Sequence, residues 1–145
     1  MRVKLAIVIV ILSAAHAFAA MTDKTPTEKI KGLCDVWINA QDNPPKLAAM
    51  TPDAVKDLVH QATYMDRCQA FINGVSNEMI GELSWLDDTH KRVVVGNWED
   101  GVTVKQEIMI FLDYVSQNPA LMNKPAVATF RKSVEAAGIY TYTAP

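Results

Sequence analysis

Apolar residues recur at helical spacing through most of the chain. The longest row starts near Val55 and continues to Leu83, with its centre between Met65 and Ile80. Residues three and four apart share one face of a helix, so this row predicts a long central helix of about eight turns. Gly74 lies in its middle, where glycine costs about 1 kcal/mol relative to alanine. We therefore expect another element to pack closely there.

A shorter helix is predicted before the long one. Thr25 would cap its first turn, Pro26 suits its first position, and Glu28 would complete a capping box. Apolar residues then recur on one face, which includes Cys34. Asn43-Pro44-Pro45 would end this helix because proline lacks the backbone donor.

Two more helices are predicted near the C-terminus. Thr103 and Gln106 form a second capping-box pattern, and Asn118-Pro119 ends the helix that they open. Asn123 would cap the last helix, and Gly138 is placed to adopt the left-handed conformation after it. Together these elements predict an all-α fold, a compact bundle of about four helices.

The segment 84–100, between the long helix and the third one, shows no clear periodicity. The run from Arg92 to Val95 and the tail from Ile139 to Thr143 are rich in strand-forming residues. A short β-pairing between them is possible on this pattern. The sequence leaves the pairing open, because one isolated strand is weak evidence for a sheet.

The N-terminus has the pattern of a secretory signal peptide. Arg2 and Lys4 precede an unbroken apolar run that is followed by small residues. The run is shorter than the roughly 20 apolar residues that a membrane-spanning helix needs, although an uncleaved anchor is the alternative. We therefore expect a signal peptide at residues 1–19 and a single exported domain at residues 20–145.

The charge of the chain indicates a class of partner, and its two cysteines predict a disulfide. The chain has 14 basic and 16 acidic residues, so without Arg2 and Lys4 there remain 12 basic and 16 acidic residues, a charge of −4. An acidic domain is a poor candidate for binding nucleic acid or an anionic membrane, and it suits a basic protein partner. Cys34 and Cys68 predict one disulfide in an exported protein, with two buried free thiols as the alternative.

No motif in the chain predicts catalysis. His60 has Asp57 three residues before it and Tyr64 four after it. In this arrangement His60 could act as a general base that Asp57 or Tyr64 orients. The same pattern is more often part of a solvated helix face. The acidic cluster from Asp87 to His90 offers a metal too few ligands from separated segments. We predict no enzyme activity, no metal site and no cofactor. An unrecognised enzyme would need these groups to converge with others in a pocket.

Aromatic and acidic residues gather in the irregular segment. Apolar rings beside acids are typical of a protein-binding surface. The alternative is that the two tryptophans only close the end of the bundle. The predicted partner-binding residues are Trp85, Asp87, Asp88, Trp98, Glu99 and Asp100.

Several motifs in order resemble the Rap/Tai immunity proteins of type VI secretion systems. CQAFINGV, from Cys68, resembles their cysteine, aromatic, isoleucine, glycine, valine signature. DGVTVKQ, from Asp100, resembles the start of their third helix, FLDYVSQNP its end, and KPAV the start of the last helix. The likeness covers about residues 33–137. Its signature residues here are Phe71, Gly74, Thr103, Gln106 and Pro119.

The family pattern has four cysteines, of which this chain lacks two. The missing positions lie near Trp98 and near Ile139 or Tyr140. Since the missing pair would bond each other, the resemblance implies that Cys34 and Cys68 are partners. It also implies that Trp98 and Tyr140 fill the vacated space by packing.

The resemblance further implies a function as an antidote. Such proteins are periplasmic, helical and often dimeric, and they bind a peptidoglycan amidase that a neighbouring cell injects and occlude its cysteine active site. Occlusion requires shape and charge complementarity and no catalytic group. The alternative is a periplasmic stress or chaperone-like protein without a toxin partner, which would also be small and helical with a single disulfide.

Overall fold

The computed structural model describes residues 24–44, 51–90 and 95–143, with side chains for 24–44, 51–81 and 98–141. The predicted signal peptide lies outside these residues. The elements in chain order are α2 (Thr27–Asp42), α3 (Pro52–His90), β1 (Val95–Trp98), α4 (Val104–Gln117), the 3-10 turn η2 (Pro119–Leu121), α5 (Ala126–Ala136) and β2 (Tyr140–Thr143). The predicted small all-α bundle is confirmed for the described part of the chain.

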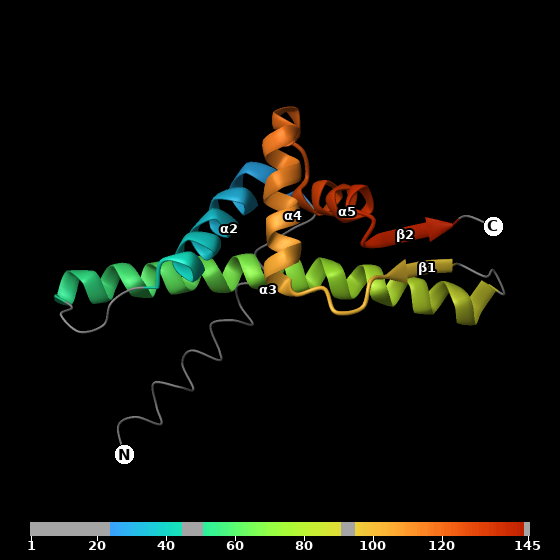
Figure 1. The fold of residues 1–145 in the computed structure, drawn as a ribbon, viewed down its shortest axis with the longest axis horizontal. Helices are drawn as coiled ribbons and strands as arrows, with labels where there is room; N and C mark the ends of the chain where they lie inside the picture. The colour runs from blue at the N-terminus through green and yellow to red at the C-terminus, as the bar shows by residue number, and fades with distance from the viewer. Residues whose placement is uncertain (1–23, 45–50, 91–94, 144–145) are drawn as a thin grey trace, which may run out of the picture.

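The other helices are arranged on α3. Its 39 residues span roughly 58 Å at 1.5 Å per residue. Figure 1 shows α2, α4 and α5 on one side of it, with β1 and β2 near its C-terminal end. Fully buried apolar side chains from all four helices meet at this junction, among them Ile30, Cys34, Cys68, Ile72, Ile108, Phe111, Phe130 and Val134.

Three phenylalanines join three of these helices. Phe71 of α3, Phe111 of α4 and Phe130 of α5 have ring centroids 6.2 to 6.4 Å apart in every pair. Tilted and edge-on contacts at this distance stabilise a core beyond the area that they bury. Phe71, a signature residue of the resemblance, therefore lies at the centre of the packing. Gly74 is half-buried in α3, and its close packing stays a prediction.

The disulfide between Cys34 and Cys68 is present, with the two Cα atoms 5.1 Å apart. It ties the middle of α2 to the middle of α3, and the free-thiol alternative is excluded. Such a bond is compatible with an oxidising compartment. Within the described residues, no helix combines the length and apolarity that crossing a membrane requires.

The first part of α3 carries its apolar residues on the outside. Val55 and Val59 are 48% and 62% exposed. The expectation of one continuous buried row is therefore wrong here. The reason is helical phase: Val59 is about two and a half turns before Cys68, so it points to the opposite face of α3.

The capping box predicted for Thr25 and Glu28 does not form, and no side chain caps α2. The N–H groups of Thr27 and Glu28 instead donate to the carbonyls of Lys124 and Met122, at 2.9 and 3.0 Å. These acceptors lie in the connection between η2 and α5. Backbone groups from a distant segment thus replace the local cap.

The start of α5 is held from the other side in the same way. Asn123 does not cap it, since Pro125 is the residue before the helix and no side chain forms a cap hydrogen bond there. The N–H of Ala126 donates to the carbonyl of Thr25 at 2.8 Å, and Pro26 and Pro125 form an isolated antiparallel bridge. The starts of α2 and α5 therefore satisfy each other's backbone groups.

The signals around α4 and after α5 are confirmed. Thr103 and Gln106 form the full capping box, with the Thr103 N–H donating to Gln106 Oε1 at 2.8 Å. Pro119, a further signature residue, opens η2 directly after α4. Gly138 has a φ of +74°, the left-handed conformation that favours glycine.

The segment predicted to be irregular is helical over its first part. α3 continues to His90, which fits the absence of glycine and proline between Gly81 and Gly96. The β-pairing is confirmed, but the strand begins at Val95, and Arg92 lies outside the described residues. β1 runs antiparallel to β2 from Val95 opposite Thr143 to Trp98 opposite Tyr140.

We predict that the double variant Cys34→Ala/Cys68→Ala loses about 3 to 4 kcal/mol of unfolding free energy, because the disulfide closes a loop of 34 residues. Urea unfolding followed by circular dichroism measures the loss. Reduced wild-type protein should unfold at a similarly low midpoint, and the variant should not respond to dithiothreitol. An unchanged midpoint in the variant would contradict the prediction.

We predict that Thr27→Val destabilises the fold by about 1 to 2 kcal/mol, the usual effect of leaving buried polar partners unsatisfied. The buried Thr27 Oγ1 lies 2.8 Å from the Lys124 carbonyl and 2.9 Å from Thr129 Oγ1. Thr25→Val is the matched control, because Thr25 contributes its backbone carbonyl. Equal unfolding midpoints for the two variants would show that the Thr27 hydroxyl is not part of this joint.

Candidate protein-binding site

The predicted partner-binding residues do not lie on one loop. Trp85, Asp87 and Asp88 fall in the last turns of α3, and their side chains lie outside the described ones. The other three predicted residues end β1 and follow it. Only the side chains of this second group, Trp98, Glu99 and Asp100, are among the described ones.

The Trp98 ring contributes to packing. It is half-buried and meets Tyr140 edge-on, with ring centroids 6.2 Å apart. The two residues are also directly opposite each other in the sheet. This confirms the packing that the resemblance implied for the positions of the missing cysteines. The structure favours the role of Trp98 in closing the end of the bundle.

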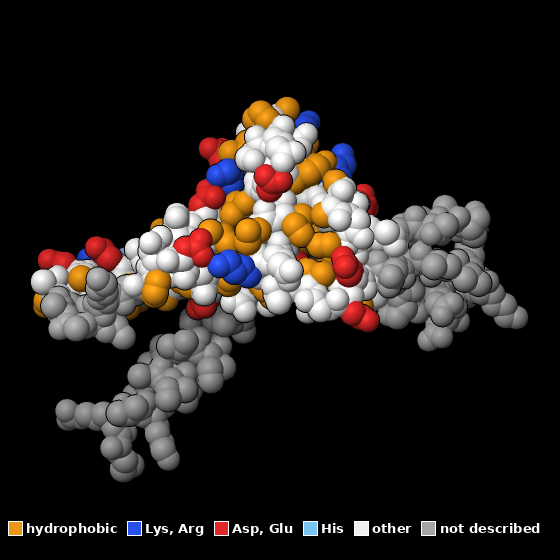
Figure 2. Space-filling model, viewed as in Figure 1, with side chains coloured by type: hydrophobic (Ala, Val, Ile, Leu, Met, Phe, Trp, Pro, Cys, Tyr) orange, Lys and Arg blue, Asp and Glu red, His pale blue; other side chains and the backbone are white. Residues whose placement is uncertain are grey.

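Glu99 and Asp100 are exposed at the rim of an open hollow of about 350 Å³, which we call the acidic hollow. It is lined by four residues after β1, three from α4 and one before β2: Glu99, Asp100, Gly101, Val102, Gln106, Met109, Ile110 and Ile139. In Figure 2, apolar side chains gather over α4 on the face shown, with acidic side chains beside them toward the sheet.

One contact to a distant segment and two local features fix the backbone at the rim of the hollow. The Glu99 N–H donates to the carbonyl of Ile139 at 2.9 Å, which extends the strand pairing by one residue. Gly101 then turns the chain with a φ of +84°, a conformation that other residues rarely adopt. The capping box at Thr103 starts α4 directly afterwards. The two carboxylates are therefore carried by a well-defined turn.

The charge of the rim is not balanced within the described part of the chain. None of the ion pairs there involves Glu99 or Asp100. Lys105 in the first turn of α4 pairs instead with Asp42 of α2, at 2.9 Å. The acidic hollow thus combines an apolar floor with negative charge that no described cation pairs with.

The sequence reasoning missed the floor of the hollow. Met109 is 52% exposed although it belongs to a helix with a well-defined buried face. The available signal was its position: Met109 interrupts the polar side of α4, between the buried Ile108 and the half-buried Ile110. A large apolar residue on a polar helix face favours a contact surface.

A second hollow, of about 510 Å³, lies between α2 and the first half of α3. It is larger, but none of its described lining residues is charged; they are Val36, Asn39, Ala40, Asn43, Gln61 and Tyr64. Neutral amides and a phenol give it little to select a partner by charge.

The histidine that could have been a base does not form a site. His60, Asp57 and Tyr64 are all exposed on α3, and among the described residues no hydrogen bond joins them. No group of three potential metal ligands occurs among the described residues either. The side chains of Asp87 and His90 lie outside that set.

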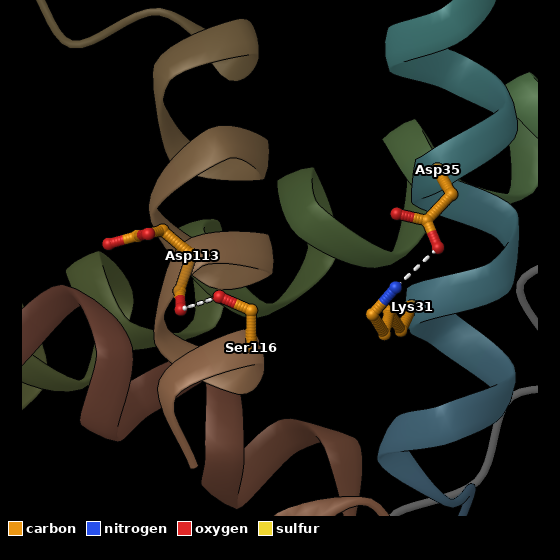
Figure 3. Close-up of polar contacts among 4 residues, drawn as sticks. All are labelled: Lys31, Asp35, Asp113 and Ser116. Carbon is orange, nitrogen blue, oxygen red and sulfur yellow. Dashed lines mark hydrogen bonds and ion pairs between the residues drawn. The ribbon is translucent and has the colours of Figure 1, made fainter. Parts of the chain in front are cut away.

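Two further polar contacts, one on α2 and one on α4, are local. Figure 3 shows Lys31 paired with Asp35 at 2.6 Å on α2, and Ser116 donating to the backbone carbonyl of Asp113 at 2.7 Å on α4. Each contact stays within its own helix. Exposed pairs of this kind contribute about 0.3 to 0.5 kcal/mol and define no site.

One carboxyl group is buried beside the core. Glu107 of α4 is only 6% exposed, and Ser76 of α3 donates to its Oε2 at 2.8 Å. Burial raises the pKa of Glu107, and the hydrogen bond from Ser76 partly opposes this. Glu107 is directly next to Gln106 at the acidic hollow, but its side chain points into the bundle.

Comparisons with protein-family models, with curated proteins and with solved structures found no match. The function therefore has to be inferred from the residues and the geometry of the chain itself.

We predict that Glu107→Gln stabilises the protein at pH 7 and has little effect near pH 4. The pKa of Glu107 is raised above its ordinary value of 4.5, so folding disfavours the charged form. The stability of the wild type therefore falls as pH rises from 4.5 through the raised pKa, whereas glutamine stays neutral. Urea unfolding at several pH values measures the difference. A difference that is independent of pH would contradict the prediction.

Proposed function

We propose that this protein is an exported, periplasmic immunity protein that binds the peptidoglycan amidase effector of a type VI secretion system and occludes its active site. The resemblance to Rap/Tai proteins supports the proposal. The residues that carry the resemblance hold defined places in the fold: Phe71 in the aromatic cluster, Thr103 and Gln106 in the capping box, and Pro119 after α4.

The single observation that carries a binding function is the acidic hollow. Two exposed carboxylates, which pair with no cation among the described residues, border an apolar floor on a well-defined turn. Apolar area supplies affinity, and uncompensated charge selects a partner of opposite sign. Residues 20–145 contain 12 basic and 16 acidic residues, and the resulting negative net charge would favour the approach of a basic partner.

Occlusion fits the described surface better than catalysis does. Inhibition by covering a cleft requires a rigid surface and no reactive group. The turn at the hollow is held by a strand pair on one side and a capped helix on the other. Such a turn can enter a cleft with little loss of conformational entropy.

The experiment is an inhibition assay with a peptidoglycan amidase effector, chosen by searching the neighbouring genes for an amidase reading frame. We expect wild-type protein to stop peptidoglycan hydrolysis at a one-to-one ratio. The double variant Glu99→Lys/Asp100→Lys should inhibit at least about tenfold less, because like charges would face a basic partner. Asp57→Lys/Asp66→Lys is the matched control, since it makes the same charge change on exposed positions of α3.

Two outcomes would count against this proposal. Full inhibition by the lysine variant at the hollow would exclude this surface from the contact. A wild-type protein that inhibits no neighbouring amidase would remove the immunity function. Thermal melting of all variants must first show that each is folded.

The exposed valines of α3 favour a second candidate, a periplasmic stress protein that holds unfolded clients. Val55 and Val59 are one turn apart on the outer face of the helix and together form a small apolar strip. Suppression of client aggregation after acid exposure, lost in Val55→Ser/Val59→Ser, would support this function. Single exposed apolar residues are common on soluble proteins, so this observation carries less than the acidic hollow.

A further inference from the structure

We infer that the acidic hollow is a socket for one arginine side chain that the bound protein presents from a loop. The inference rests on the proposed function for the identity of the partner, but it concerns the chemistry of this one site. The combination of charge, apolar floor and size selects the occupant.

The charge requires a cation. Glu99 and Asp100 are adjacent in sequence and both exposed, and none of the described residues that line the hollow is basic. Lys105, the nearest base in sequence, is drawn toward α2 by its 2.9 Å ion pair with Asp42. A cation from outside would therefore meet no internal competitor among the described residues.

The floor requires a long aliphatic stem. Val102, Met109 and Ile110 are partly or largely exposed there, and they supply apolar area below the rim. Arginine and lysine cover apolar surface with their methylene groups while the charged head stays in water. Among the described lining residues, no His or Cys and no third carboxylate joins Glu99 and Asp100 as a metal ligand. Met109 can adjust to the stem because its side chain is flexible and polarisable.

The head group favours arginine over lysine. Two neighbouring carboxylates can accept several hydrogen bonds from a planar guanidinium, which has five N–H donors in a fixed arrangement. Lysine would place a point charge and make fewer simultaneous contacts. The open hollow, of about 350 Å³, has room for one long side chain.

Nuclear magnetic resonance titration tests the socket without the partner. We expect N-acetyl-arginine amide, added to the exported protein labelled with nitrogen-15, to shift the backbone amides of Gly101, Val102 and Met109. N-acetyl-citrulline amide has the same shape without the charge, and methylguanidinium has the charge without the stem. Both should bind at least about threefold more weakly, the ratio expected when one exposed ion pair or a few apolar contacts are lost.

Variants locate the binding in the hollow. Glu99→Gln/Asp100→Asn should weaken binding of N-acetyl-arginine amide at least about threefold. Asp57→Asn/Asp66→Asn, which removes the same charge from α3, should leave it unchanged. Equal binding of citrulline and arginine amides, or shifts that map away from the hollow, would overturn the inference.

The amidase assay separates failure of the socket from failure of the proposed function. If wild type and Glu99→Gln/Asp100→Asn inhibit the amidase equally, the socket is not used by the partner, and the inference is wrong while the immunity function stands. If arginine amide binds in the hollow but wild type inhibits no amidase, the socket stands and the partner belongs to another class. If Glu99→Gln/Asp100→Asn reduces inhibition and the control Asp57→Asn/Asp66→Asn does not, the result supports both the socket and the immunity function.

Discussion

The disulfide between Cys34 and Cys68 is the constraint on which the helical arrangement depends. Both cysteines are fully buried, and their bond fixes the point where α2 meets α3. Phe71 lies one turn after Cys68, so the aromatic contacts to α4 and α5 form beside the same point. A helix as long as α3 gains most of its stability from packing, and this junction supplies it. The first part of α3, with Val59 exposed, depends on continuity with the packed part.

The second constraint joins segments that are distant in sequence. Thr27 at the start of α2 contacts Lys124 before α5, 97 positions later. Each helix start would otherwise leave N–H groups without partners. Because the two starts exchange backbone hydrogen bonds, neither can move without exposing the other. The disulfide and this joint hold α2 at its middle and at its beginning.

Much of the fold follows from local patterns, and the errors have physical causes. The capping box at Thr103 and the glycine at Gly138 depend on neighbouring residues only, so the sequence contains all that is needed to predict them. The caps expected at Thr25 and Asn123 were displaced by tertiary hydrogen bonds that local reasoning cannot see. The exposure of Val59 could have been predicted from helix geometry. Val59 and Cys68 are nine residues apart, which places their side chains on opposite faces of an α-helix.

The candidate site was only partly predictable for the same reason. Glu99 and Asp100 are visible in the sequence as acids beside aromatic residues, but Met109 and Ile139 join them only through the fold. Trp98 is drawn into packing by Tyr140, a contact that depends on the register of two strands about 40 residues apart. Composition can therefore indicate a binding segment, whereas the floor of a site comes from tertiary structure.

The buried carboxyl group of Glu107 and the exposed ones of Glu99 and Asp100 differ in how the fold surrounds them. Glu107 is enclosed and accepts a hydrogen bond from Ser76, so its environment is completed within the fold. Glu99 and Asp100 stand on rigid backbone with no cation near them among the described residues. Under the proposed function, a cation from the partner would give these two carboxylates a group of opposite charge. The turn that carries both carboxylates is held by backbone and capping contacts that involve neither carboxylate, so a partner could bind them without disturbing the contacts that hold the turn.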